Sequence, residues 1–399
     1  MSAADTAWLL VSSALVLLMT PGLAFFYGGL VRGRNVISTI MLSFMSMAVV
    51  SVVWVLWGYS LAFGEGSAFL GDLSLLGLKG MEPGDEMLFA IFQMMFAIIT
   101  PALITGAVVE RFKFTTYLVF LVAWVTLVYA PVAHWVWAGN GWLYELGALD
   151  FAGGTVVHIN AAIAAVAAAT LIGKRRNPGL EPGNVPYVVM GAGILWFGWF
   201  GFNAGSGLAA NAVAVNAFLV TNTAAAMAAL TWGLLSQFQH KRMSAAGVAT
   251  GAVAGLVAIT PAAGAVGVMG ALGIGFGAGL LCYGAVLLRP RLKLDDSLDV
   301  FAVHGVGGIW GALATGIFTV GAYVGADKGG LLEGNFGQLG TQAIGVIATL
   351  VYSLVVSLII LKVLDVIPGL GLRVSEREED AGLDIAAHGE RAVVHDGAD

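Results

Sequence analysis

Long apolar segments are the feature that most constrains the fold of this chain. Eleven stretches are each long enough to cross a hydrocarbon core of about 30 Å as a helix, and short polar breaks separate them. Of 399 residues, 59% are hydrophobic and 11% are charged, against roughly 25% charged in soluble domains. We therefore predict an all-α polytopic membrane protein. Its expected spans are about 7–30, 36–63, 87–109, 115–137, 152–172, 186–206, 214–238, 244–260, 264–288, 299–324 and 338–367.

The composition limits the function as well as the fold. A chain with so little polar surface is neither a soluble enzyme nor a disordered protein, and its net charge of −6 argues against binding nucleic acid. The single cysteine, Cys282, excludes a disulfide scaffold. No nucleophile–base pair or cofactor-binding motif is visible, so we expect neither an enzyme nor a bound cofactor.

Basic residues divide the connecting loops into two groups. The loops after spans one, three, five, seven and nine hold twelve Lys and Arg residues, whereas the loops after the even-numbered spans hold only Lys79 and Lys328. Because Lys and Arg accumulate in cytoplasmic loops, this alternation predicts that the N-terminus lies outside the cell and the C-terminus inside it. We expect the membrane to be the cell inner (plasma) membrane. The twelve are Arg32, Arg34, Arg111, Lys113, Lys174, Arg175, Arg176, Lys241, Arg242, Arg289, Arg291 and Lys293.

We predict two parts of unequal size. Residues 1–372 form a membrane channel domain, with repeat halves at about 1–180 and 181–330 and an extra helix at about 338–367. Residues 373–399 form a cytoplasmic tail with a net charge of −5. The start of the chain contains no basic segment, so we interpret it as the first span rather than as a signal peptide.

Two segments of the chain repeat one pattern. Asp150 and His158 are eight residues apart in the fifth span, and Asp296 and His304 are eight residues apart in the tenth. Each histidine leads into a helix of small residues. By the predicted topology, one helix enters from outside and the other from inside, as in the inverted repeats of transporters. We therefore predict an inverted five-plus-five repeat followed by one extra helix.

The same spacing predicts the depth of both histidines. Eight residues at 1.5 Å rise place each about 12 Å from its own membrane face, near the middle of a core about 30 Å thick. Ionisable groups at that depth are costly and commonly mark a transport pathway. Two alternatives remain for His158 and His304. In the first, they are two unrelated buried histidines, each bonded to a carbonyl group. In the second, they bind a metal, but no Cys or carboxylate within a turn of either histidine completes a ligand set.

Four motifs stand in the order Thr20–Gly29, Asp150–Asn160, Trp199–Ser206 and Asp299–Gly305. Together they resemble signatures of the Amt/Mep/Rh ammonium transporter family, and they are most similar to its bacterial and archaeal Amt branch. The resemblance runs through all eleven spans and into the tail. It implies a homotrimer in the lipid bilayer, with one pore per subunit, whose substrate is ammonium or ammonia and whose analogue is methylammonium.

The resemblance implies a site at the outer mouth that recruits ammonium ion. Trp137, Phe96 and Ser206 match its residues, and Asp150 matches a position that organises it through its electric field. Aromatic faces attract cations, and a serine oxygen can accept an N–H hydrogen bond. Taken alone, Trp137 could equally belong to an interfacial tryptophan belt, and Asp150 could simply cap the helix that follows it.

The resemblance also implies the inner parts of the pore. Phe96 and Phe202 match a pair of stacked rings that closes the outer end as a hydrophobic gate. His158 and His304 match paired imidazoles that bind ammonia or relay a proton. Two facing neutral rings can share one proton, because each has one donor and one acceptor nitrogen. The supporting pore residues are Phe92, Gln93 and Trp199.

The predicted function is therefore an ammonium transporter or channel that recruits ammonium ion, deprotonates it and conducts ammonia, with the route of the proton left open. The tail segments Gly371–Val374 and Gly382–Glu390 resemble a region that couples to trimeric PII-type signal proteins on the cytoplasmic face. A solvated acidic extension is the alternative for the tail. The alternative functions are an ammonium sensor that signals through a PII-type partner and a neutral gas channel of the Rh kind.

Overall fold

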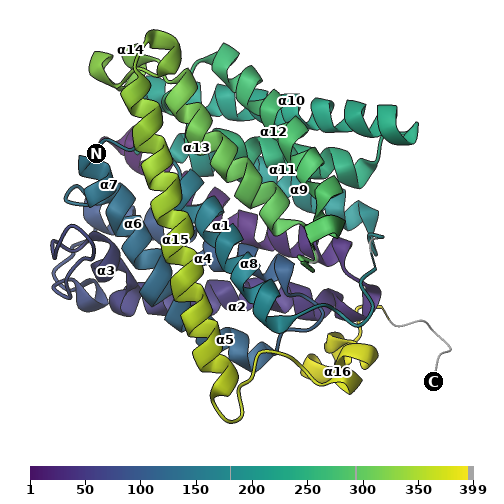
Figure 1. The fold of residues 1–399 in the computed structure, drawn as a ribbon. Coiled ribbons are helices and arrows are strands. Elements are labelled where there is room, and N and C mark those ends of the chain that lie inside the picture. Colours follow the sequence, from purple (N-terminus) through teal and green to yellow (C-terminus); the bar gives the residue numbers. More distant parts are fainter. Residues whose placement is uncertain (180, 293, 394–399) are drawn as a thin grey trace.

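The computed structural model describes residues 1–179, 181–292 and 294–393, and within them the regular secondary structure is helical apart from one isolated β-bridge between Phe112 and Arg373. Within them, ten helical segments are long and apolar enough to cross a membrane, and an additional apolar helix, α11 (Ala245–Ile259), is shorter. This confirms the predicted all-α polytopic fold (Figure 1). Most observed spans begin and end within about four residues of their expected bounds, but the span expected at 299–324 already ends at Phe318, where a separate short helix follows.

Several spans combine an α-helix with a π-helical turn, a feature that often lies at functional sites. The first five spans are α1 (Ala3–Leu30); α2 (Val36–Val53) with η2 (Trp54–Gly58) and α3 (Tyr59–Phe63); α4 (Asp85–Ile104); α5 (Phe114–Trp124) with η5 (Val125–Tyr129) and α6 (Ala130–Trp137); and η6 (Gly154–Ile159) with α8 (Asn160–Ile172).

Six spans follow, of which two include a π-helical turn. They are α9 (Val185–Trp199) with η7 (Phe200–Ala204); α10 (Ala212–His240); α11; α12 (Val268–Leu288); η9 (Phe301–Gly305) with α13 (Val306–Phe318); and finally α15 (Phe336–Val366).

Short helical turns occupy the connections and the tail. They are α7 (Trp142–Glu145), α14 (Gly321–Val324), α16 (Glu376–Ala381), η1 (Gly33–Asn35), η3 (Leu76–Leu78), η4 (Thr105–Ala107), η8 (Arg289–Leu292), η10 (Ala326–Lys328), η11 (Leu331–Glu333) and η12 (Asp384–His388).

Small residues allow the spans to pack closely. A Cβ added to Gly29 of α1 would lie only 2.6 Å from the Val188 nitrogen of α9. A Cβ added to Gly275 of α12 would lie 2.5 Å from the Ala224 carbonyl oxygen of α10. Such close backbone approach is the usual basis of helix association in lipid. The long α15 lies across the front of the molecule against α8 and α13 (Figure 1).

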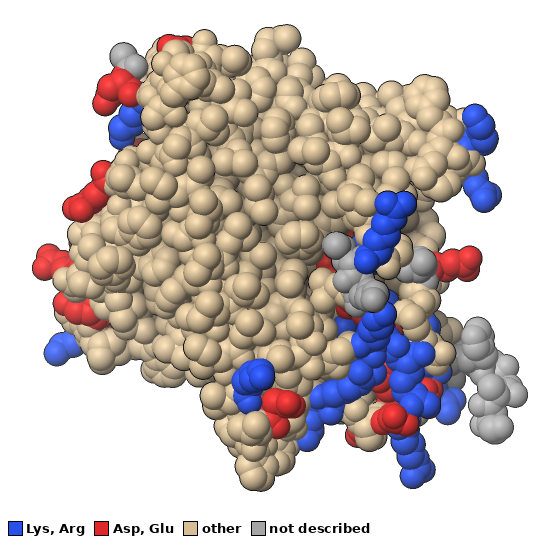
Figure 2. Space-filling view, viewed as in Figure 1, with Lys and Arg blue, Asp and Glu red and all other residues tan. Residues whose placement is uncertain are grey.

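The surface separates into an apolar band and charged margins. Figure 2 shows a broad face without charged side chains, with Lys and Arg gathered near the tail helix α16. Large apolar side chains such as Val215 and Leu230 of α10, and Ile347 and Val351 of α15, are exposed. Water would disfavour so much exposed apolar surface, whereas lipid does not. The chain is therefore a multi-pass membrane protein.

Candidate functional site

A buried aspartate caps the start of the fifth span. Asp150 precedes η6, is 8% exposed, and takes part in none of the ion pairs found among the described residues. Its carboxylate accepts hydrogen bonds from donors at the helix start, which have no partner within the helix. These donors are the N–H groups of Gly153 (2.9 Å), Gly154 (2.5 Å), Thr155 (2.8 Å) and Val156 (3.2 Å), together with the Thr155 hydroxyl.

Trp137 lies beside this cap, and we call this end of the molecule the tryptophan end. Its indole N–H donates to the Asp150 carbonyl oxygen at 2.9 Å, and its ring meets Phe96 edge-on with the centroids 5.7 Å apart. The Ser206 hydroxyl donates to the Phe202 carbonyl oxygen at 2.8 Å. The lone pairs of that hydroxyl remain available to accept a hydrogen bond. The structure therefore joins the predicted recruitment residues in one continuous group.

Two phenylalanine rings from different spans meet next to Trp137. Phe96 of α4 and Phe202 of η7 have ring centroids 4.4 Å apart, and they are 1% and 0% exposed. Phe92, one turn earlier on α4, packs against Phe96 with the centroids 5.0 Å apart. Gln93 is also buried, and its amide oxygen has no hydrogen-bond partner among the described residues. The two rings are in contact and almost fully buried between Trp137 and His158.

The two histidines of the predicted repeat meet in the middle of the bundle. The Nδ1 atoms of His158 in η6 and His304 in η9 lie 3.2 Å apart, and the rings stack with centroids 5.3 Å apart. One ring donates in this contact and the other accepts, because a single proton occupies the bond. His158 also stacks on Trp199 and Phe202, with centroids 5.5 and 6.0 Å away. Its Nε2 is buried without a partner in the described part of the chain.

Two small cavities lie along this line of side chains, and we call the line from Trp137 to the second cavity the passage. One cavity, with a volume of about 10 Å³, is walled by Phe202, Trp199 and both histidines. That is about the space of one water molecule. A second chamber, of about 50 Å³, lies on the other side of His304. From the tryptophan end, the order along the passage is Trp137, Phe96, Phe202, His158, His304 and the second chamber.

A second buried aspartate caps the tenth span. The Asp296 carboxylate accepts hydrogen bonds from the N–H groups of Val300 at 3.1 Å and Phe301 at 2.7 Å. Asp299 follows it, forms an ion pair with Arg289 at 2.8 Å and lines the second chamber. The Asp–His pattern found in the sequence therefore corresponds to the same local construction twice: an aspartate cap, a π-helical turn and a histidine that faces the other histidine.

Sequence reasoning missed three residues that the structure places along the passage. Tyr27 and Thr250 line the second chamber, and Thr260 accepts the hydrogen bond of the Trp199 indole at 2.9 Å. Tyr27 lies inside the first motif, which is a signal that could have identified it. Thr250 and Thr260 belong to the eighth span and its end, where no motif was recognised, so only the packing of the spans reveals them.

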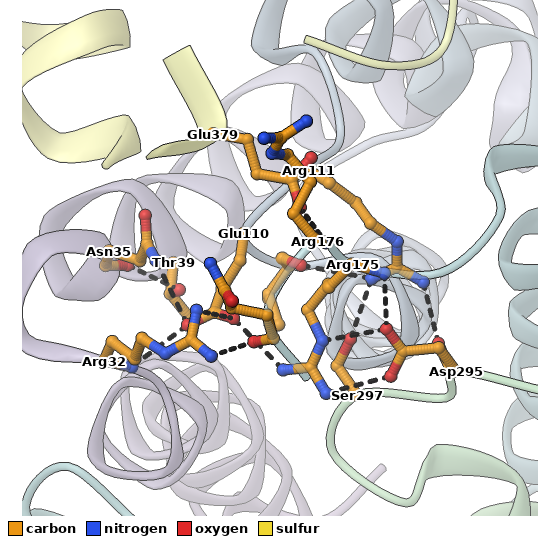
Figure 3. Close-up of polar contacts among 12 residues, drawn as sticks. Arg32, Asn35, Thr39, Glu110, Arg111, Arg175, Arg176, Asp295, Ser297 and Glu379 are labelled. Carbon is orange, nitrogen blue, oxygen red and sulfur yellow. Dashed lines mark hydrogen bonds and ion pairs between the residues drawn. The ribbon is translucent and has the colours of Figure 1, made fainter. Parts of the chain in front are cut away.

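At the opposite end, which we call the tail end, a buried arginine ties three loops together (Figure 3). Arg111 is 0% exposed. Its guanidinium donates to the Gly173 carbonyl oxygen at 2.8 Å, to the Ser297 hydroxyl at 2.8 Å and to the Asp295 carbonyl oxygen at 2.7 Å. These bonds join the loop after the third span to the loops after the fifth and ninth spans.

A chain of ion pairs extends from this arginine. Arg175 contacts the Glu110 carboxylate at 3.1 Å and the Asp295 carboxylate at 2.9 Å. Burial raises the pKa of Asp295, but hydrogen bonds from Arg175 outweigh burial and hold that pKa below its usual value. Glu110 also accepts hydrogen bonds at 3.1 Å from the Arg32 backbone N–H and the Asn35 amide. The network thus reaches the loop after the first span.

The C-terminal tail docks onto this network. Glu379 is 6% exposed and accepts from the Arg176 backbone N–H and the Arg373 guanidinium, both at 2.7 Å. Asp384 is 1% exposed and accepts from the Ser38 N–H, at the start of α2, at 2.8 Å. The tail is therefore packed through these residues and is not simply a solvated extension. Residues 394–399 of the predicted tail lie outside the described residues.

The fold and the passage define a class: a multi-pass membrane protein with a narrow route lined by aromatic rings and two histidines. Residues 7–393 match the model of the Ammonium Transporter Family. The chain is 48% identical over 399 residues to the ammonium transporter Amt1 of Archaeoglobus fulgidus, covering 98% of this chain and all of that protein. It is 46% identical over 402 residues to the ammonium transporter of Bacillus subtilis, covering 98% and 99%.

Solved structures agree with these matches. The crystal structure of Saccharomyces cerevisiae Mep2 superposes with a TM-score of 0.89 at 38% identity, covering 95% of this chain and 89% of that one. A structure described as a sensor Amt protein gives a TM-score of 0.89 at 33% identity, covering 96% and 98%. The chain belongs to the ammonium transporter family. This confirms the resemblance inferred from the four motifs, and it assigns the chain to a family of transporters rather than enzymes.

Proposed function

We propose that this chain is an ammonium transporter or channel of the cell inner (plasma) membrane. Ammonium ion is recruited at the tryptophan end, is deprotonated, and crosses as ammonia. The observation that carries the proposal is the unbroken line of side chains from Trp137 through Phe96 and Phe202 to His158 and His304. Family membership supports the substrate, since the relatives at 46–49% identity are named as ammonium transporters.

Trp137, Phe96, Ser206 and Asp150 form the recruitment site in this proposal. Indole and phenyl faces attract a cation by roughly 0.5–2 kcal/mol each. The Ser206 oxygen can accept an N–H hydrogen bond because its own proton is bound to the Phe202 carbonyl oxygen. Asp150 acts at a distance, because its carboxylate is occupied by helix donors. Its charge is not cancelled by an ion pair in the described part of the chain, so its field favours a cation nearby.

The phenylalanine pair is the hydrophobic gate. An isolated ion that enters a medium of low dielectric constant loses tens of kcal/mol of solvation by idealised estimates, whereas neutral ammonia loses far less. Rings in contact exclude water and therefore select the neutral form. Phe92 and Trp199 support these rings through direct contacts. Gln93, next to Phe92, is the least constrained of the supporting residues that we propose.

The histidine pair is the binding site for ammonia and the relay for its proton. When ammonium is deprotonated, one N–H bond breaks, its electron pair stays on nitrogen, and the proton passes to a ring nitrogen of His158. The proton already shared between the Nδ1 atoms then moves to His304, which releases a proton from its Nε2 to the second chamber. The 3.2 Å separation of the Nδ1 atoms supports this transfer.

The remaining parts follow from the topology and the family. We place the tryptophan end outside and the tail end inside, because Lys and Arg gather at the tail end (Figure 2). Residues 1–372 form the channel, with repeat halves of about 1–180 and 181–330, and residues 373–399 form the tail. The protein assembles as a homotrimer, and its tail offers a docking surface to a PII-type signal protein.

One further candidate function has an observation in its favour. A structural neighbour with a TM-score of 0.89 is described as a sensor, and the tail of this chain is joined to the loops after the first, third and fifth spans. A sensor would bind ammonium without appreciable flux and would change its affinity for a PII-type partner.

The deciding experiment is flux and current through the purified protein in a planar membrane and in vesicles with an ammonium gradient. We expect protein-dependent ammonium flux. A current that reverses with the gradient means net charge movement, and flux without current means neutral ammonia. Vesicles that take up no more ammonium than protein-free vesicles would contradict transport. Ammonium-dependent binding of a PII-type protein in the absence of flux would support the sensor.

A further inference from the structure

Trp199 lines the passage, and one hydrogen bond ties its indole to the end of the eighth span. The ring is 2% exposed, and its Nε1–H donates to the Thr260 hydroxyl oxygen at 2.9 Å. Thr260 is fully buried and follows directly after α11. Its own hydroxyl proton is donated to the Leu256 carbonyl oxygen at 2.7 Å. The hydroxyl can therefore only accept from the indole, which has one donor and no acceptor.

The face of the Trp199 ring covers His158. The two ring planes lie within 22° of parallel with centroids 5.5 Å apart, and Phe202 packs on the same indole at 5.4 Å. Trp199 and His158 also wall the first cavity, so neither ring is closely packed on that side. Thr260 is not among the described residues that wall this cavity. Packing alone does not hold the indole on the cavity side, whereas the bond to Thr260 holds it from outside the cavity.

The residue after Thr260 contacts the turn that carries His158. The Pro261 carbonyl oxygen accepts a hydrogen bond from the Phe151 N–H at 3.1 Å. A Cβ added to Gly154, the first residue of η6, would lie 2.6 Å from the Pro261 side chain, so the proline packs directly against the backbone there. The stacked indole and imidazole come from different spans, yet both contact adjacent residues at the end of a third span. These two residues are thus placed to fix the stacked rings relative to each other.

A bond of the same kind occurs elsewhere in the bundle. The Trp124 indole of α5 donates to the Ser357 hydroxyl of α15, also at 2.9 Å, and it is likewise fully buried. Among the aromatic contacts of the described residues, its ring packs on Phe120 and on neither pore histidine. A buried indole therefore needs an acceptor even where it has no pore neighbour. What distinguishes the bond to Thr260 is the imidazole stacked on the indole that it holds.

We propose that Thr260 is the positioning residue for Trp199 and, through it, for His158, a role that rests on the proposed passage of ammonia along the two histidines. The hydroxyl holds the indole against the imidazole, and the stacked indole keeps the His158 Nδ1 directed at His304, 3.2 Å away. Without the hydroxyl, the indole turns toward the first cavity and narrows the passage. Conduction should therefore depend on Thr260, whereas recruitment at Trp137 should not.

The bond itself is tested by solid-state NMR of the full-length protein, labelled with 15N-tryptophan, in liposomes. Trp199→Phe identifies the indole signal of Trp199 by its loss. We expect the indole proton of wild type and of Thr260→Ser at the downfield shift of a hydrogen-bonded N–H, and we expect Thr260→Val to move it upfield. The same shift in wild type and Thr260→Val would overturn the bond and with it the positioning role. This measurement does not involve transport, so its outcome is independent of the proposed function.

The positioning role is tested by methylammonium uptake into proteoliposomes, with rates normalised to the inserted and folded protein. Thr260→Val keeps the shape of the side chain and removes the acceptor. We expect Vmax to fall about tenfold, as the loss of about one hydrogen bond from the conducting state would cause, while KM stays within about twofold of wild type. Thr260→Ser keeps the hydroxyl and should recover most of Vmax. An unchanged Vmax in Thr260→Val, or no recovery in Thr260→Ser, would overturn the role.

A double-mutant cycle tests whether Thr260 acts through the indole. In the Trp199→Phe background the indole donor is absent, so adding Thr260→Val leaves no buried donor without a partner there and should not lower Vmax further. A further fall of the same size would show that Thr260 acts independently of Trp199, which contradicts the proposal. This pair also decides the question if Thr260→Val alone fails to fold.

Ser357→Ala is the matched control, because it removes the acceptor of the Trp124 indole at the same distance. We expect it to keep the wild-type KM and Vmax. If Ser357→Ala lowers Vmax as much as Thr260→Val, the loss of any indole bond between spans explains the effect and the specific role of Thr260 is wrong. If the wild-type protein takes up no methylammonium, the proposed function fails and the role in conduction with it, while the indole signal of Trp199 still decides the bond.

Discussion

At each end of the passage, an aspartate caps the start of a span, but the charged side chains near the two aspartates differ. At the tryptophan end, the Asp150 carboxylate accepts four backbone N–H groups and one hydroxyl, and no basic side chain pairs with it among the described residues. At the other end, Asp296 accepts only two N–H groups, and Arg289 lies beside it, donating to its carbonyl oxygen at 3.2 Å and pairing with Asp299.

The comparison distinguishes two effects of a capping aspartate: its hydrogen bonds to backbone N–H groups stabilise the start of the helix, and its charge can attract a cationic substrate. Both aspartates satisfy donors at the start of a span that carries a pore histidine. The Asp150 carboxylate has no ion-pair partner among the described residues and lies next to aromatic faces, which is the combination that we propose attracts a small cation. At the tail end, Arg289 pairs with Asp299 and Arg175 pairs with Asp295, so basic and acidic side chains there offset one another.

The largest expected difference between the two ends is the effect on uptake of removing each capping aspartate. We expect Asp150→Ala to abolish methylammonium uptake or assembly, because several buried N–H groups lose their acceptor at about 1–3 kcal/mol each. Asp150→Glu should retain some uptake. Asp296→Ala loses fewer bonds and should keep measurable uptake. Uptake assays paired with size-exclusion chromatography test this, and normal uptake by a folded Asp150→Ala protein would contradict the assignment.

The next largest effect is expected at the point where the two halves of the passage meet. His158→Asp places a carboxylate between the gate and His304, and an anion there favours ions that cross as ions. We expect this variant to lose selectivity for ammonium over potassium, whereas His158→Ala and His304→Ala should uncouple charge from substrate. Potassium currents beside wild type in the same membrane measure the effect. Equal exclusion of potassium and equal ammonium rates would show that the rings are packing residues.

A smaller effect, on the KM for methylammonium, is expected when the Trp137 ring alone is removed. Trp137→Leu removes a cation–π contact of roughly 0.5–2 kcal/mol, and we expect KM for methylammonium to rise about tenfold with Vmax nearly unchanged. Trp135→Leu is the matched control, since the Trp135 indole bonds to the Phe69 carbonyl oxygen and lies away from Phe96 in the packing. Equal changes in both variants would mean that Trp137 serves as an interfacial anchor.

The smallest effect concerns pH at the tail end. Burial raises the pKa of Asp299, just before the tenth span, from 3.8 to about 7, and the Arg289 guanidinium offsets only part of this rise. The folded state therefore holds this proton longer than the unfolded state, so the free energy of unfolding falls as pH rises from about 4 to about 7. Asp299→Asn should reduce the loss of Tm between pH 5 and pH 8 by a few degrees.

Asp72→Asn is the control for this pH effect, because hydrogen bonds from Ser74 lower the pKa of that half-buried carboxyl, so no transition near pH 7 is expected from it. Thermal melts of the purified protein at several pH values provide the comparison. An Asp299→Asn profile parallel to wild type would show that Asp299 is ionised throughout this range in the folded protein.

Much of the fold was predictable because hydropathy and helix geometry are local properties. The expected span 338–367 corresponds to Phe336–Val366, and the weakly marked span 244–260 corresponds to the short α11. The burial of Arg111 is a feature that these local properties do not predict. As a loop arginine it would be expected in water, yet it is 0% exposed, because loops far apart in the chain and the tail close over it.

The number of spans, the position of both Asp–His pairs and the family could be predicted from the amino-acid sequence, since each depends on residues within one segment or on short motifs. Which side chains meet depends on the packing of the spans and could not be predicted in this way. His158 and His304 lie 146 positions apart and share a hydrogen bond, and His134 faces two carbonyl oxygens from a different span. The spacing of side chains within one helix does not predict which side chains of other spans they contact, because those contacts depend on how all the spans pack together.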